Sequence, residues 1–325
     1  MTLHPRMLLL SAAFALGLGS IAQAADSVTL RYLASQGGLS AYELAEELGY
    51  FKDTGVKIEN VGYAAGGPAS LIALASGDVE IGSAATSAVL NSIAGGNDFV
   101  AAYPSNGINK EVQSIYYVLD NSPIKTIKDL AGKSIAVNTL GAHLDYTTRE
   151  ALHSAGLPSD SANLVVVPGP QLEQVLRSGQ VDVSAFGYWQ TTFEGAAKKA
   201  GGIRPIFGDT DVLGEIAGGF IVLRRDFIKA HPDLAKVFVE QSQRALDYAR
   251  EHPEETKAIF AKALSARGEN GEIAQYFRGF GVRPGGKATE RDVQFWIDVL
   301  EREGKLKPGQ LVAKTILYDA ASASN

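Results

Sequence analysis

Two pairs of side chains with suitable chemistry for a binding site lie 102 positions apart (188 − 86): Thr86 with Ser87, and Tyr188 with Trp189. Each pair is expected just after a β-strand, where a helix begins. Hydroxyls and free helix N–H groups can bind a small anionic or polar group, and aromatic rings can cover an apolar body. The four side chains therefore predict two facing walls of a ligand cleft. The alternatives are a plain N-cap for Thr86 and a buried core position for Trp189.

The same 102-residue shift relates two longer segments. Leu74 to Ile81 (LASGDVEI) matches Leu176 to Val183 (LRSGQVDV), and a Gly-x-Val-acidic-aliphatic pattern recurs in both. A helix–Gly–strand connection is common, so a chance match is the alternative. The matching order of elements over about 100 residues favours two similar lobes.

Other loops are expected to border the same cleft because they follow equivalent strands. His143, as a cation or hydrogen-bond donor, could meet a carboxylate or sulfonate, and a solvated loop histidine is the alternative. Gly66 and Gly67 open a helix whose backbone amides could point inward, or they form a turn with no other role. These loops add the following candidate ligand-binding residues: Ser35, Gln36, Gly37, Gly66, Gly67, Gly141, Ala142 and His143.

Catalytic and metal-binding patterns are missing from the sequence. There is no Cys among 325 residues, which excludes thiol nucleophiles, disulfides and Cys-based metal sites. No H-E-x-x-H or G-x-S-x-G motif occurs, and the phosphate-loop-like segment 281–288 has Ala288 where Ser or Thr should hold magnesium. The net charge of −6 argues against nucleic acid as a partner. We expect no enzyme, no cofactor and no metal.

The N-terminus has the three parts of a secretory signal peptide. Arg6 supplies the positive region, Met7 to Gly19 the apolar region, and Ala22-Gln23-Ala24 the small-residue cleavage pattern. The apolar region is too short to span a membrane. We therefore expect residues 1–24 to be removed and the remainder to be released into the periplasm.

The rest of the chain alternates β-rich runs with helical stretches, which predicts an α/β fold with parallel sheets covered by helices. Residues 25–117 and 222–325 should form one lobe and residues 118–221 the other. The β-rich runs Gln113 to Leu119 and Gly219 to Leu223 should be the two crossings between them, the second after a Gly-rich loop. The segment after Asp226 should be mostly helical, including Ile273 to Phe280. The predicted strands include Val79 to Gly82 in the first lobe and Ser134 to Asn138 in the second.

Several stretches resemble one family in the order in which they occur. They are Glu47 to Val56, Gly66 to Gly82, Ile127 to Val137, and Arg224 to Phe227 followed by His231-Pro232. In this order they resemble the solute-binding proteins of bacterial ABC importers, in the group that serves taurine, alkanesulfonates, nitrate and thiamine-precursor pyrimidines. The resemblance implies a two-lobed clamshell that closes on one small ligand and is recognised by a membrane permease with its ATPase. We expect a monomer.

Two departures from that family concern the ligand. Sulfonate and taurine binders commonly carry Gly-Ser-Thr/Ala-x-His-Tyr where this chain has Gly141 to Tyr146, so hydroxyls are replaced and the His is moved. The Trp-Asp-Pro-like segment of the family becomes Tyr188-Trp189-Gln190, and Tyr146 and Trp189 are the positions that match. The loss of hydroxyls argues against a simple alkanesulfonate, and His143 beside Tyr188 and Trp189 would suit an organic anion with a flat or aromatic body. The expected solute is a small organic anion, either a sulfonate or an aromatic or aliphatic carboxylate. The alternatives are a nitrate or pyrimidine-precursor binder, a sensor-type binding module, and an enzyme on the same scaffold.

Overall fold

The computed structural model describes residues 27–319, so the predicted signal peptide and its cleavage site lie outside the described residues. Helices and strands alternate along the chain, as the α/β prediction requires. The first elements are β1 (Val28–Ala34), α1 (Ala41–Glu47), β2 (Val56–Tyr63), α2 (Gly67–Ser76), β3 (Gly82–Ala85), α3 (Thr86–Ala94) and β4 (Phe99–Ile108).

A second series with the same alternation follows. It comprises β5 (Ile115–Leu119), β6 (Ser134–Val137), α4 (His143–Ser154), β7 (Asn163–Val166), α5 (Leu172–Arg177), β8 (Val183–Phe186), α6 (Thr191–Ala200), β9 (Ile203–Gly208) and α7 (Thr210–Leu213). The long strand β10 (Ile216–Arg224) then returns to the first series. The C-terminal helices are α8 (Arg225–Ala230), α9 (Pro232–Glu251), α10 (Pro253–Ala266), α11 (Glu290–Arg302) and α12 (Ala313–Ile316).

The two series build sheets of matching topology. In the second series the strand order is β7-β6-β8-β5-β9. In the first, the sheets β1-β2 and β3-β10-β4 meet through a single parallel bridge between Tyr32 and Ile81, which gives the order β2-β1-β3-β10-β4. The strand that crosses over, β10 or β5, lies antiparallel in fourth place in each. The repeat predicted from the sequence is confirmed at the level of topology.

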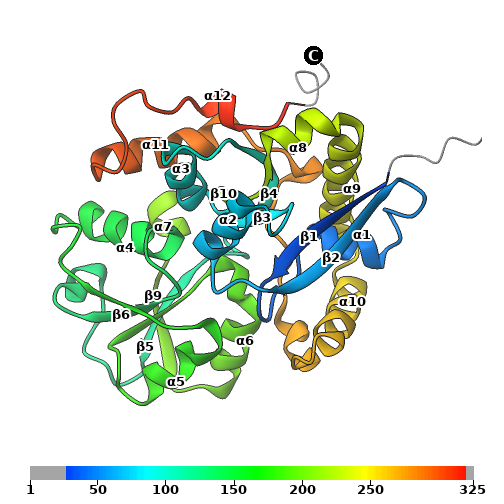
Figure 1. Ribbon diagram of the computed structural model, residues 1–325. Coiled ribbons are helices and arrows are strands. Elements are labelled where there is room, and N and C mark those ends of the chain that lie inside the picture. Colours follow the sequence, from blue (N-terminus) through cyan, green and yellow to red (C-terminus); the bar gives the residue numbers. More distant parts are fainter. Residues whose placement is uncertain (1–26, 320–325) are drawn as a thin grey trace, which may run out of the picture.

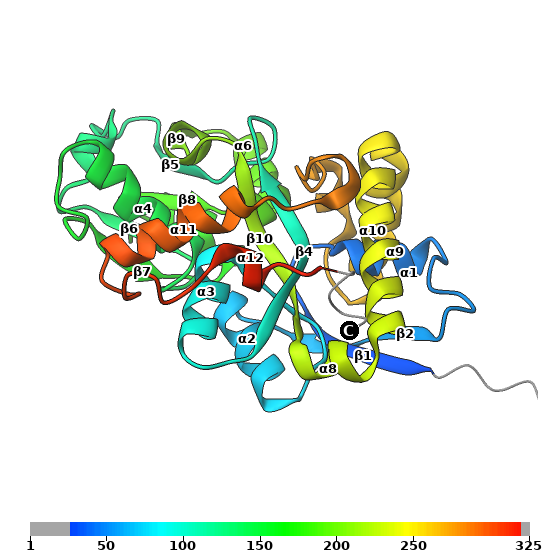
Figure 2. The ribbon, with the colours of Figure 1, turned by 90° about the horizontal axis from the view of Figure 1, so that it is seen from above.

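We call β1–β4 and β10 with α1–α3 the first half, and β5–β9 with α4–α6 the second half. Figure 1 shows the second half in green and the strands β1 and β2 on the opposite side, beside α9 and α10. Figure 2 shows α11 lying along α3 and reaching toward α4 of the second half. Chain segments link the halves after β4 and after β9. The exact lobe boundaries at residues 117/118 and 221/222 stay a prediction.

Three predicted elements need correction. The strand predicted over Val79 to Gly82 is instead Gly82–Ala85. Glu80 and Ile81 both donate their N–H groups to the same Arg31 carbonyl, so only an isolated bridge forms there, and the regular pairing with β10 begins at Gly82. The helix predicted over Ile273 to Phe280 is a short 3₁₀ turn, Gly271–Tyr276, since Gly279 (φ 88°) and Gly281 (φ 65°) bend the chain after it. The predicted Gly-rich loop before β10 contains α7.

Candidate functional site

A cavity lies where the strand ends of the two halves meet. Its hydroxyl-bearing lining residues are Ser35, Ser40, Ser70, Ser83, Ser105, Thr191 and Thr192. Its carboxamides are Asn106 and Asn138, and its aromatic residues are Tyr188, Trp189, Phe260 and Phe277. No Asp, Glu, Lys, Arg or His of the described chain lines it. The cavity can therefore hold a charged group only by hydrogen bonds and backbone dipoles.

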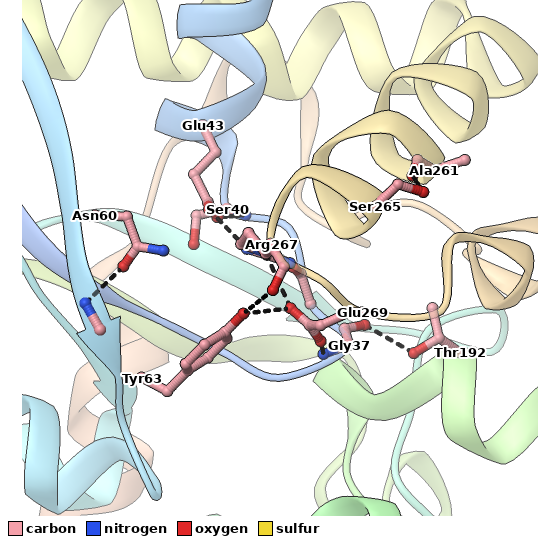
Figure 3. Close-up of polar contacts among 12 residues, drawn as sticks. Gly37, Ser40, Glu43, Asn60, Tyr63, Thr192, Ala261, Ser265, Arg267 and Glu269 are labelled. Atoms are coloured by element: carbon pink, nitrogen blue, oxygen red, sulfur yellow. Dashed lines mark hydrogen bonds and ion pairs between the residues drawn. The ribbon is translucent and has the colours of Figure 1, made fainter.

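The loop after β1 is held by two hydrogen bonds, one to the C-terminal segment and one to the second half. Gly37 donates its N–H to Glu269 Oε2 at 2.6 Å, and its carbonyl accepts a hydrogen bond of 2.8 Å from the Thr192 hydroxyl at the start of α6. Figure 3 shows these two contacts from opposite directions. Gly37 has a φ of 62°, and a Cβ at this position would lie 2.5 Å from the Phe193 ring. Only glycine allows the two halves to approach this closely here.

A buried charged cluster supports that loop from behind. The Arg267 guanidinium pairs with Glu43 at 2.9 Å and with Glu269 at 3.0 Å, and it donates to the Gly38 carbonyl at 2.6 Å. The Tyr63 hydroxyl donates to Glu269, as Figure 3 shows. Burial raises the pKa of the Glu43 carboxyl above its usual range, although Arg267 opposes the effect. Two carboxylates surround Arg267, so the cluster gives the cavity no free positive charge.

Three helices begin at the cavity wall. Gly66 and Gly67 at the start of α2, Ala85 before α3, and Thr191 in α6 all line it. None of these helices has a side chain that caps its first N–H groups. A helix N-terminus carries a partial positive charge and unpaired N–H donors. These three helix starts can bind an anion without a charged side chain.

The aromatic wall comes from the turn after β8. The Tyr188 and Trp189 rings meet edge to face, 4.7 Å apart, and both line the cavity. Tyr188 donates its backbone N–H to the Ser114 hydroxyl at 3.1 Å, and burial raises the pKa of its phenol well above the usual range. A Cβ on Gly218 would lie 2.6 Å from the Tyr188 ring, so this ring packs directly on the backbone of β10.

His143 lies behind this wall rather than in the cavity. Its imidazole is fully buried and pairs with Asp209 at 2.8 Å, and its ring lies 4.9 Å from the ring of Tyr188 and 5.6 Å from that of Trp296. The expectation that His143 borders the cleft is therefore wrong. It is the first residue of α4, and the helix turns it toward Asp209 at the end of β9.

Six of the thirteen sequence candidates line the cavity, namely Ser35, Gly37, Gly66, Gly67, Tyr188 and Trp189. Gln36 is exposed beside it. Thr86 and Ser87 are buried, and the Thr86 hydroxyl donates to the carbonyls of Ala217 and Gly218 instead. Gly141 and Tyr146 each accept a hydrogen bond from the Asn91 amide of α3, and Ala142 is buried beside them. Whether any candidate contacts a ligand stays a prediction.

Several lining residues were not predicted from the sequence. Asn138 directly follows β6, and Thr191 and Thr192 directly follow the Tyr188 turn, so strand-end position was a usable signal for all three. Phe260 and Phe277 come from the C-terminal segment, where an apolar residue on an amphipathic helix is normally core. Both residues lie outside the repeated segments, so the strand-end signal did not apply to them.

Two further kinds of feature are absent from residues 27–319. No group of three or more His, Cys, Asp or Glu side chains there is arranged to hold a metal ion. No helix in the described part of the chain combines the length and apolar character needed to cross a membrane.

Comparison with known proteins identifies related sequences and a shared fold. The family model described as "NMT1/THI5 like" matches residues 39–256. A relative from Escherichia coli K12, whose name describes binding of aliphatic sulfonates, is 27% identical over 198 residues, which cover 61% of this chain and 60% of that relative.

Two solved structures share the fold. The alkanesulfonate-binding protein SsuA from Xanthomonas axonopodis pv. citri, bound to MOPS, superposes with a TM-score of 0.72 at 20% identity over 91% of this chain and 99% of that one. The desulfurization enzyme DSZB superposes with a TM-score of 0.62 at 16% identity over 91% and 99% of the two chains. The predicted two-lobed binding-protein fold is confirmed, and the same scaffold also carries an enzyme.

Proposed function

Because the chain belongs to the NMT1/THI5-like family, we propose that it is the solute-binding component of an ABC importer and captures a small organic anion between its two halves. The observation that carries the proposal is the cavity. It combines three uncapped helix starts, several hydroxyls and four aromatic side chains, and no charged side chain of residues 27–319 lines it. That combination suits an anionic group joined to an apolar body.

The proposed solute is a sulfonate or a carboxylate with an aromatic or aliphatic body. The helix starts of α2, α3 and α6 replace the water around the anionic group. Tyr188 and Trp189 from the second half and Phe260 and Phe277 from the C-terminal segment cover the apolar part. Closure of the two halves then shifts the population toward a form that a membrane partner recognises.

The place of action and the partners belong to the same proposal. A signal peptide over residues 1–24 would direct the chain to the periplasm as a monomer. The partner would be a permease with its ATPase at the inner membrane. A sensor, a nitrate binder, a pyrimidine-precursor binder and an enzyme are outcomes of the test below.

The test is native mass spectrometry of residues 25–325, followed by thermal unfolding with taurine, alkyl and aryl sulfonates, aromatic carboxylates, nitrate and pyrimidines. A ligand that binds only the folded chain raises the melting temperature. We expect a selective rise with an organic sulfonate or carboxylate, and recovery of the compound unchanged. A rise with nitrate or pyrimidines alone would overturn the proposed solute, and consumption of a compound would overturn the transport function.

A matched pair of variants links the result to the cavity. Trp189→Ala removes part of the aromatic wall and should weaken binding about tenfold or more. Trp296→Phe changes the other tryptophan, which is fully buried outside the cavity, and should leave affinity within about twofold. Equal affinities for wild type and Trp189→Ala would place the solute elsewhere.

A further inference from the structure

One polar atom in the cavity wall has no partner in the protein. Asn138 follows β6 in the second half and lines the cavity, and its Oδ1 is buried without a hydrogen bond. Its Nδ2 faces the first half, 3.4 Å from the position that a Cβ would take on Gly66. A buried carbonyl oxygen without a donor is costly, so a bound molecule that supplies the donor gains affinity.

Among the described lining residues, Asn106 carries the other carboxamide, but its oxygen is not one of the buried side-chain atoms that lack a hydrogen-bond partner. The helix starts offer only N–H donors, and the hydroxyls can both donate and accept. The carboxamide oxygen of Asn138 only accepts. An anionic oxygen against it would be repelled, because neither atom carries a hydrogen. The surroundings of Asn138 therefore favour a part of the solute that is chemically different from its anionic group.

We propose that Asn138 is a specificity-determining residue, and that the solute is an organic anion with a separate hydrogen-bond donor, an ammonium or hydroxyl group, that reaches Asn138 Oδ1. This inference rests on the proposed function and narrows its substrate class. The anionic group binds the helix starts. The donor group of the same solute meets the second half, so both halves hold it when the cavity closes.

Two pairs of probes isolate the donor group. 4-Hydroxybenzenesulfonate and 4-methylbenzenesulfonate differ by a hydroxyl in place of a methyl, and taurine and propane-1-sulfonate differ by an ammonium in place of a methyl. Isothermal titration gives the dissociation constants for the mature protein. In at least one pair we expect the donor-bearing member to bind about tenfold or more tightly, since an unsatisfied buried acceptor penalises the other member.

Three variants test the assignment to Asn138. Asn138→Leu has a similar shape and no polar atoms, and should reduce the preference to about twofold or less. Asn138→Asp keeps the acceptor and loses the amide donor, so the preference should survive, most strongly for taurine. Asn121→Leu changes an exposed asparagine outside the cavity and should leave the preference unchanged.

The outcomes separate the two proposals. Binding of methyl and donor-bearing probes with equal affinity, or a preference unchanged in Asn138→Leu, would overturn the role of Asn138 and leave the binding function standing. A preference lost in Asn138→Asp would show that the solute depends on the amide N–H rather than on Oδ1. That result would also overturn the proposed role of Asn138. No binding of any organic anion would overturn the proposed function, and this inference with it.

Discussion

The two halves use one repeated acidic residue in the same way. In the first half, Glu80 Oε2 accepts the Arg31 N–H of β1 at 2.8 Å, and Glu80 returns its own N–H to the Arg31 carbonyl at 3.0 Å. In the second half, Asp182 Oδ2 accepts the Ser134 N–H of β6 at 2.9 Å, and the Asp182 N–H returns to the Ser134 carbonyl at 3.1 Å. The acidic residue of the Gly-x-Val-acidic pattern therefore ties β3 to β1 in the first half and β8 to β6 in the second, which are the third and second strands in each strand order.

The halves differ where the next strand ends. Ser83, Ala84 and Ala85 of β3 line the cavity in the first half, while the segment after β8 of the second half supplies Tyr188 and Trp189. At this strand end the first half thus presents backbone and small side chains, and the second half presents large aromatic ones. The repeated residues maintain the fold, and the residues that break the repeat form the site.

The largest effect should come from a buried second-half residue that lies behind the cavity wall. His143→Ala removes the imidazole that lies 2.8 Å from the buried Asp209 carboxylate and leaves a void beside Trp296. We expect the free energy of unfolding to fall by about 3 kcal/mol. Urea denaturation measures it, and the solute affinity should change less than tenfold because His143 lies behind the wall.

His153→Ala is the control on the same helix. Its side chain is 54% exposed and lies 4.0 Å from Glu150, so the loss should stay below about 0.5 kcal/mol. If His143→Ala kept its stability and lost binding instead, the original sequence prediction of a ligand-facing His143 would be restored.

The fold could be predicted well because it depends on local signals. Helix α3 begins at Thr86, directly after a strand as predicted, and β6 spans Ser134–Val137 where a strand was predicted over Ser134 to Asn138. The 102-residue repeat anticipated the matching strand orders. Boundaries failed where tertiary contacts decide them, as at Ile81, whose pairing depends on the Arg31 carbonyl of another strand.

The site could be predicted only in part, because topology brings loops to a shared edge but does not orient their side chains. Both candidate pairs follow equivalent strands, yet Thr86 turns to the carbonyls of β10 while Trp189 faces the cavity. His143 was misplaced because its partner Asp209 is 66 residues away, at the end of another strand. Phe277 reaches the cavity from a segment outside the repeat.

A smaller effect should follow from a methyl group in the first-half loop. Gly37→Ala places a Cβ within 2.5 to 2.8 Å of Phe193 in the second half, so the halves cannot close as they do now. We expect solute affinity to fall about tenfold, the result of roughly 1.4 kcal/mol of overpacking in the closed form. Gly49→Ala is the control: it has a similar left-handed φ of 72° and nothing within 4 Å of the added Cβ. It shares the backbone strain and should bind normally, and equal losses in both variants would contradict a role for closure.

The smallest effects test the repeated acidic residue itself. Burial tends to raise the pKa of Glu80, but the hydrogen bonds and charge of Arg31 outweigh it, so this pKa lies below its usual value of 4.5. The Ser134 N–H lowers the pKa of Asp182 below its usual 3.8. A lowered folded-state pKa gives stability that is present above the unfolded-state pKa and is lost as the pH falls through the folded-state value.

At pH 7 we therefore expect Glu80→Gln to cost about 1 to 2 kcal/mol and Asp182→Asn about 0.5 kcal/mol, because Glu80 also pairs with the Arg31 guanidinium at 2.7 Å while Asp182 is exposed. Urea denaturation at pH 7 and pH 3 measures both. At pH 3, below both unfolded-state values, each variant should approach wild type. A Glu80→Gln penalty that is unchanged at pH 3 would mean that packing, rather than the carboxylate, joins β1 to β3, and the equivalence of the two halves would then be one of shape alone.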